Sequence, residues 1–193
     1  MRNVIDNIDL PLEDLNILEV FGRDGSSNIS HYYGKVKSVE IWEINPKYQP
    51  ILRQKFPNAI IRIWDSIKTL EHYSHFFLYD MIVLDCPSQT YCGAKGEPYC
   101  ECFDILPNIG KLFEKKTLLV MNVWDKTPDN ITPLWQKKRD MFYGVDAHLI
   151  TPEFLDSFYI EYFKKLGITV KMIKHIRRGE TICYYMLYLE KTQ

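Results

Sequence analysis

The chain has 193 residues, of which 46% are hydrophobic and 25% are charged, the balance of an ordinary globular protein. This length accommodates one α/β domain with a sizeable core. The 24 basic and 25 acidic residues give a formal net charge of −1, which argues against a basic nucleic-acid-binding surface over the whole chain.

The N-terminal residues, the lack of long apolar segments and the cysteine count indicate where in the cell the protein is expected. The first six residues lack the apolar core of a signal peptide. No segment approaches the roughly 20 apolar residues that span a membrane. The five cysteines, an odd number, favour free thiols in a reducing compartment. We therefore expect a cytoplasmic protein without a membrane partner.

Taken in chain order, the sequence predicts an arm over residues 1–14 and then alternating strands and helices. Strands are expected at 16–21, 38–44, 59–64, 79–84, 117–123, 169–176 and 182–189. Helices are expected at 28–33, 46–56, 67–77, 103–113, 134–143 and 151–166. Arg177-Arg178-Gly179-Glu180 between the last two strands indicates a hairpin. The prediction is one α/β domain over 1–193, a Rossmann-like, doubly wound, mostly parallel sheet with a C-terminal antiparallel hairpin.

The stretch from Leu15 to Asp65 has the pattern of a cofactor site. The first strand is followed by Gly22-Arg23-Asp24-Gly25-Ser26-Ser27-Asn28, whose small and turn-forming residues permit a tight bend. A helix is expected to begin near Ser26 or Ser27. The second strand ends on the acid Glu43, about 20 residues on, as in dinucleotide-binding sheets. Because the loop lacks GxGxxG, NAD binding is disfavoured.

The segment Glu19-Val20-Phe21-Gly22-Arg23-Asp24-Gly25 resembles the first motif of the class I S-adenosylmethionine-dependent methyltransferases. Glu19 and Gly25 match that motif, whereas Phe21 and Arg23 stand where the family usually has glycine. The order of strands and helices resembles the family over nearly the whole chain. The resemblance implies the methyltransferase fold, with S-adenosyl-L-methionine as cofactor.

Four acids fall at the carboxyl ends of the first four predicted strands, where open α/β sheets bind ligands. By the resemblance, Glu43 accepts bonds from both ribose hydroxyls, Asp65 reads the adenine amino group with help from Ser66, and Glu19 lies near the methionine amino group. Each acid alone is equally well explained as a cap of the following helix. The cofactor-binding residues we expect are Glu19, Phe21, Gly22, Gly25, Asn28, Glu43, Ile44, Asp65, Ser66 and Asp85.

Asp85-Cys86-Pro87-Ser88 partly matches the family's fourth motif, which lies beside the reactive methyl group. Asp85 is the first candidate catalytic residue, because a carboxylate can accept a substrate proton or orient a nucleophile. The alternative is a simple turn after a buried strand. His148 is a second candidate, as a general base. The cysteines at 86, 92, 100 and 102 lack the paired spacing of zinc sites, so no metal is expected.

Without a large appended domain, the acceptor would be recognised by the arm and by segments 86–102 and 124–150. The expected substrate-binding residues are Pro87, Tyr91, Trp124, Arg139 and Tyr143. Two basic clusters, Lys137-Lys138-Arg139 and the group Lys171, Lys174, Arg177 and Arg178, are either solvated faces or recognition sites for an anionic substrate group.

The function predicted is S-adenosylmethionine-dependent methyl transfer to a small-molecule or short-peptide acceptor, with an anionic group on the acceptor as one option. Three alternatives remain open: a nucleic-acid methyltransferase, an aminopropyl transferase of the spermidine-synthase type, and a non-catalytic binding protein with the same fold. Fold alone does not separate them.

Overall fold

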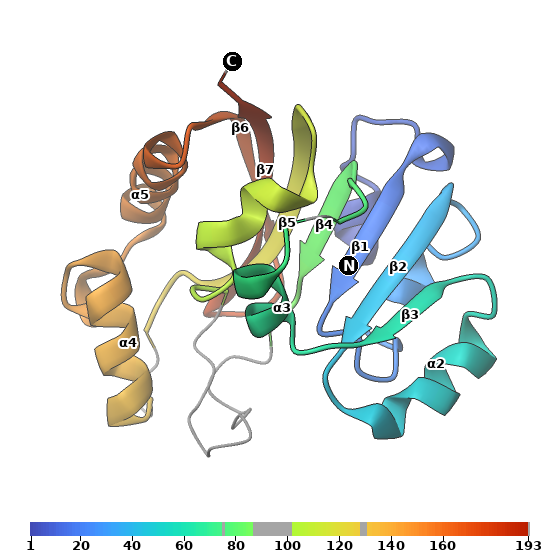
Figure 1. Cartoon of the computed structure of the whole chain (residues 1–193). Helices are drawn as coiled ribbons and strands as arrows, with labels where there is room; N and C mark the ends of the chain where they lie inside the picture. The colour runs from blue at the N-terminus through green and yellow to red at the C-terminus, as the bar shows by residue number, and fades with distance from the viewer. Residues whose placement is uncertain (75, 87–101, 128–130, 193) are drawn as a thin grey trace.

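The computed structural model describes residues 1–74, 76–86, 102–127 and 131–192. One seven-stranded sheet with the order β3-β2-β1-β4-β5-β7-β6 forms its centre (Figure 1). Strands β1 to β5 pair in parallel, whereas β7 is antiparallel to both β5 and β6. The predicted mostly parallel sheet with a C-terminal antiparallel hairpin is confirmed. The strands are β1 (Asn16–Val20), β2 (Ser38–Glu43), β3 (Ile60–Ile63), β4 (Met81–Leu84), β5 (Lys116–Trp124), β6 (Ile168–Arg177) and β7 (Ile182–Lys191).

Helices pack on both faces of this sheet. The longer ones begin at residues that cap free amides: the Thr132 side chain accepts from the Trp135 amide, and the Thr151 side chain accepts from the Phe154 amide. A proline follows each threonine, where its missing N–H has no cost. The α-helices are α1 (Arg2–Ile5), α2 (Gln49–Lys55), α3 (Ser66–His72), α4 (Pro133–Tyr143) and α5 (Pro152–Lys165).

Three predicted helices are wrong in type or length. The helix expected at 28–33 is a 3-10 turn, Ile29–His31, and the helix expected to reach 77 ends at His72. The helix expected at 103–113 is the 3-10 helix Leu106–Leu112. The proline at position 107 explains this last difference, because in an α-helix its ring would clash with the carbonyl four residues earlier.

Buried side chains form one apolar cluster on each face. α4, α5 and the 3-10 helix Leu106–Leu112 cover one face, and α2 and the N-terminal residues cover the other. The central strands alternate between the two clusters, as Leu18 and Val20 do against Ile17. A sheet covered on both faces leaves its strand ends as the place for a site. No helix within the described ranges is long and apolar enough to cross a membrane.

Candidate functional site

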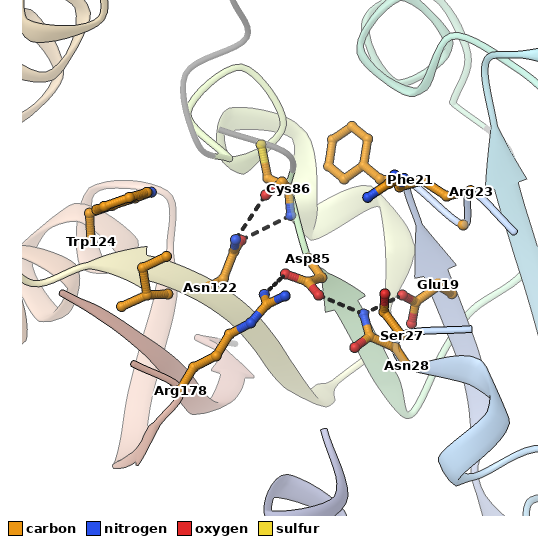
Figure 2. Close-up of a pocket in the computed structure, with 12 residues that line it drawn as sticks. Glu19, Phe21, Arg23, Ser27, Asn28, Asp85, Cys86, Asn122, Trp124 and Arg178 are labelled. Atoms are coloured by element: carbon orange, nitrogen blue, oxygen red, sulfur yellow. Dashed lines mark hydrogen bonds and ion pairs between the residues drawn. The ribbon is translucent and has the colours of Figure 1, made fainter. Parts of the chain in front are cut away.

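A cavity of about 300 Å³ lies at the carboxyl ends of β1, β4 and β5, where the turn between β6 and β7 also reaches. Figure 2 shows Asp85 in the middle, the β1 loop on one side, and Trp124 and Arg178 on the other. We call these sides the loop half and the hairpin half. The lining residues are Glu19, Phe21, Gly22, Arg23, Ser27, Asn28, Asp85, Cys86, Asn122, Trp124, Arg178 and Ile182.

The loop after β1 has a left-handed backbone at every second residue. The φ angles are +67° at Phe21, +47° at Arg23 and +71° at Gly25. A side chain in this region costs roughly 1–2 kcal/mol per residue. The chain therefore keeps a glycine-type backbone at two positions that carry side chains. Such strain concentrates at functional sites.

The two glycines of this loop are required for close packing beneath it. A Cβ at Gly22 would lie 2.3 Å from Ile41 Cγ2, and a Cβ at Gly25 would lie 2.2 Å from the Phe56 ring. Both glycines thus let the loop sit directly on β2 and α2. This loop-to-sheet contact fixes one wall of the cavity.

Glu43 holds the loop through its carboxylate. Its Oε2 accepts from the Arg23 amide and its Oε1 from the Asn45 amide, each at 2.7 Å. The side chain is buried, so these charge-assisted bonds are shielded from water. They contribute to maintaining the left-handed conformation at Arg23.

Glu19 is a buried acid in the loop half. Its Oε1 accepts from Asn28 Nδ2 at 2.9 Å, and its Oε2 accepts from the Tyr32 hydroxyl at 2.5 Å. Burial raises the pKa of Glu19 to about 8, even though these two hydrogen bonds act in the opposite direction. Near pH 7 this carboxyl is therefore mostly protonated, and a bound cation would favour its ionisation.

Asp85, directly after β4, joins the two halves. Its Oδ2 accepts from Asn28 Nδ2 at 2.9 Å and from the Tyr184 hydroxyl at 3.0 Å. Its Oδ1 accepts from Arg178 Nη1. An aspartate with three donors has its charge stabilised and its orientation fixed.

The hairpin half is supported by polar contacts to the backbone. The Asn122 side chain accepts from the Cys86 amide at 2.9 Å and donates to the Cys86 carbonyl at 2.8 Å. Arg139 Nη2 donates to the Trp124 carbonyl at 2.9 Å. Next to them, Arg177 Nη1 pairs with the fully buried Asp125 at 2.7 Å. The ends of β4 and β5 are thus held in place from beneath.

The structure brings several of the predicted site residues together in this cavity and places others elsewhere. The predicted residues on the lining are Glu19, Phe21, Gly22, Asn28, Asp85 and Trp124. Gly25 lies on the underside of the loop against Phe56, and Glu43 lies behind the loop. These placements leave the predicted roles as predictions.

The predicted ribose and adenine positions follow β2 and β3, beyond the lining of this cavity. Asp65 caps α3, because its Oδ1 accepts from the Lys68 amide at 3.2 Å. Ser66 is the first residue of α3 and is buried, whereas Ile44 is half-buried. The capping role of Asp65 is therefore present whether or not it also binds a ligand.

Other predicted residues lie apart from the cavity. His148 is exposed in the 3-10 turn Ala147–Leu149. Arg139 and Tyr143 are buried under the hairpin half, where the Tyr143 hydroxyl bonds to that of Tyr159 at 2.9 Å. Pro87 and Tyr91 lie outside the described residues, as do Cys92 and Cys100. Within the described part of the chain, no three His, Cys, Asp or Glu side chains gather as a metal site.

Several lining residues are not among the predicted site residues. Arg178 is in the sequence one member of a basic cluster, although its neighbours Gly179 and Glu180 indicate a turn. Asn122 lies inside the apolar strand β5 and Ile182 is the first residue of β7, so neither position carries a local signal of a site. The others are Arg23, Ser27 and Cys86, which belong to motifs that were noted.

No family model matches the chain, and no curated protein matches it. Solved structures do match its fold. The N-methyltransferase NodS from Bradyrhizobium japonicum has a TM-score of 0.58 at 11% identity, covering 100% of this chain and 94% of NodS. The 1,6-didemethyltoxoflavin N1-methyltransferase of Burkholderia thailandensis, solved with S-adenosylhomocysteine, has a TM-score of 0.58 at 10% identity, covering 94% and 72% of the two chains.

A third match is the methyltransferase CalH in complex with S-adenosylhomocysteine, with a TM-score of 0.64 at 14% identity. The alignment covers 99% of this chain but 55% of CalH. At such low identity these likenesses concern the arrangement of the backbone. The resemblance seen in the first motif is confirmed at that level: the chain has the fold of the class I S-adenosylmethionine-dependent methyltransferases.

Proposed function

We propose that this protein is an S-adenosylmethionine-dependent methyltransferase with a small-molecule acceptor. The observation that carries the proposal is the β1 loop, whose backbone is left-handed at positions 21, 23 and 25. The resemblance places glycine at all three positions, and this chain adopts the conformation even with Phe21 and Arg23 there. Matching solved structures that contain S-adenosylhomocysteine support the same cofactor.

The residues of the loop half fit the amino-acid end of this cofactor. Glu19 and Asp85 are acids placed to face an ammonium group, and the loop backbone lies beside them. Each Glu43 oxygen accepts one amide bond and has a second lone pair, which suits ribose hydroxyls. Asp65 and Ser66 would hold the adenine. When bound, the cofactor supplies an electrophilic methyl group on a positively charged sulfur.

The hairpin half would receive the acceptor. Trp124 and Ile182 provide apolar surface, and Asp85 provides a fixed carboxylate between the two halves. Positioning by these walls is the main contribution that such a site makes to a methyl transfer. An acceptor of small-molecule size, with an anionic group, suits a cavity of about 300 Å³ that contains Arg178.

A second candidate function is non-catalytic binding, and Phe21 is the observation that favours it. Its side chain lines the cavity at a position where the family usually has glycine. Incubation with S-adenosylmethionine and a deproteinised small-molecule extract separates the two functions. An enzyme releases S-adenosylhomocysteine over time, whereas a binding protein retains the cofactor unchanged.

Calorimetric titration of S-adenosylhomocysteine into wild type, Glu43→Ala and Glu43→Gln tests the cofactor site. We expect micromolar binding to wild type and none to Glu43→Ala, because both the ribose partner and the loop anchor are lost. Glu43→Gln keeps one acceptor oxygen and should bind at least about tenfold more weakly than wild type. Glu71→Ala, which removes an exposed acid from α3, is the matched control. Binding to Glu43→Ala at wild-type affinity would contradict the assignment, and no binding to wild type would contradict the proposed cofactor.

A further inference from the structure

Arg178 enters the cavity from a different part of the chain than the other charged groups. It lies in the turn between β6 and β7, and its guanidinium sits 5.2 Å from the centre of the Tyr184 ring. Its side chain remains 40% exposed although it pairs with Asp85, whose side chain is 8% exposed. A half-exposed cation on a turn can exchange its partner at low cost, because water is already in contact with it.

The two oxygens of Asp85 have different surroundings. Oδ2 is held by Asn28 and Tyr184, both of which are buried. Among the described residues, Arg178 is the hydrogen-bond partner of Oδ1. Withdrawing Arg178 would therefore leave Asp85 in place, with one oxygen turned toward the cavity and ready to accept.

The position of Arg178 assigns it to the hairpin half. In the sheet, β4 lies between β1 on one side and β5 on the other, and β7 follows β5. Figure 2 accordingly shows Arg178 approaching Asp85 from the side of Trp124, opposite Glu19 and Arg23. A ligand that exchanges with the Asp85–Arg178 contact would therefore enter from the side of the cavity lined by Trp124 and Ile182, opposite the loop.

A guanidinium selects planar anions, because its N–H groups form a fork that matches the two oxygens of a carboxylate. The apolar lining in the hairpin half is a flat indole, Trp124, and a branched aliphatic side chain, Ile182. The charges and the shape thus favour a flat molecule that carries a carboxylate.

We propose that Arg178 determines acceptor specificity by binding the carboxylate of an aromatic amino- or hydroxy-carboxylic acid. In binding it, Arg178 leaves Asp85 Oδ1, which then accepts a hydrogen bond from the N–H or O–H group of the same molecule. The same exchange therefore binds the carboxylate of the ligand to Arg178 and frees Asp85 to orient the nucleophilic N–H or O–H group of the ligand. This inference rests on the proposed function, since it identifies the hairpin half as the acceptor site.

The test uses 2-aminobenzoate and its neutral counterpart 2-aminobenzamide, titrated by calorimetry into protein with and without saturating S-adenosylhomocysteine. We expect 2-aminobenzoate to bind wild type more tightly than 2-aminobenzamide. In Arg178→Gln its affinity should fall at least about tenfold, whereas 2-aminobenzamide should be little affected. Arg178→Lys, which keeps the charge but loses the fork, should be intermediate.

Lys171→Gln is the matched control, because it removes one positive charge from β6 of the same hairpin, where Lys171 pairs with Glu190 at 3.3 Å. Its affinity for 2-aminobenzoate should equal that of wild type. Equal binding of 2-aminobenzoate to Arg178→Gln and wild type, or no preference of wild type for the acid over the amide, overturns the inference. A tenfold loss of S-adenosylhomocysteine affinity in Arg178→Gln also overturns it, since Arg178 would then serve the cofactor.

The titrations also separate this inference from the proposed function. If wild type binds S-adenosylhomocysteine but not 2-aminobenzoate, the specificity inference fails and the cofactor site stands. If wild type binds 2-aminobenzoate through Arg178 without binding S-adenosylhomocysteine, the methyltransferase proposal fails, and with it the role of the acid as acceptor.

Discussion

The two halves of the cavity are built on different principles. The loop half depends on backbone conformation: alternate left-handed residues, two tightly packed glycines and a glutamate that anchors amides. The hairpin half depends on charged side chains, with Arg177 at the end of β6 and Arg178 in the turn after it paired to acids that follow β5 and β4. A wall formed by a fixed backbone conformation suits one particular ligand. Side chains on a turn can be substituted without changing the fold, so they can determine which ligand binds. This difference is consistent with the proposed function, in which the loop half binds the cofactor and the hairpin half binds the acceptor.

The largest effect we expect concerns the buried acid of the loop half. The pKa of Glu19 is raised from 4.5 to about 8, mainly by burial. The unfolded chain therefore releases this proton near pH 4.5, whereas the folded protein keeps it until about pH 8. The favourable contribution of protonated Glu19 is complete below pH 4.5, declines as pH rises, and is lost above about pH 8.

Glu19→Gln should remove this dependence while keeping a side chain that can bond to Asn28 and Tyr32. Between pH 5 and 9, wild type should lose on the order of 3 kcal/mol more unfolding free energy than Glu19→Gln. Urea unfolding followed by circular dichroism at several pH values measures the difference. Parallel curves for the two proteins would mean that Glu19 is ionised in the folded state, and that the loop half does not contain a neutral acid.

The next effect distinguishes two adjacent arginines of the hairpin half. Arg177→Gln leaves the fully buried Asp125 without its cation, which should destabilise the fold by about 3 kcal/mol. Arg178→Gln should cost less than about 1 kcal/mol, because Asp85 keeps Asn28 and Tyr184 as donors. Urea midpoints of the two variants, measured at pH 7, give the comparison directly. Equal losses would show that both arginines are structural, and would remove the distinction between anchoring and recognition.

Much of the loop half could be predicted from the sequence, because its signals are local. The acid and the two glycines of the first motif lie within seven consecutive residues at the end of β1, and Glu43 follows at the end of the next strand. The alternation of strands and helices also predicted a mostly parallel sheet with a C-terminal antiparallel hairpin. The errors came from short elements, such as the 103–113 segment, where Pro107 blocks an α-helix.

The hairpin half could not be predicted in the same way. Arg178 and Asp85 are 93 residues apart, and no sequence pattern near either residue predicts that they pair. The basic cluster around Arg178 was visible, but its members have different partners: Lys174 bonds to Asp9, Arg177 to Asp125 and Arg178 to Asp85. Only the packing of β7 beside β5 brings the turn to the end of β4. Long-range pairing of this kind follows from the fold and not from local pattern.

The smallest effect tests whether the loop half stores strain. Arg23 is exposed and has a φ of +47°, so glycine at this position should relieve about 1 kcal/mol of backbone strain. Part of the gain is offset because glycine raises the entropy of the unfolded chain. Arg23→Gly should therefore stabilise the protein by about 0.5 kcal/mol, as measured by urea unfolding.

The same substitution at Arg53, an exposed residue of the helix α2, provides the control. There glycine should destabilise by about 1 kcal/mol, because the backbone is already helical and only the entropy cost remains. Opposite signs for the two arginine-to-glycine variants would show that the left-handed loop is maintained against its own residues by Glu43 and the packing of the glycines. If Arg23→Gly instead destabilises as much as Arg53→Gly, the left-handed conformation at Arg23 carries no strain. The loop half would then hold no more backbone strain than the hairpin half.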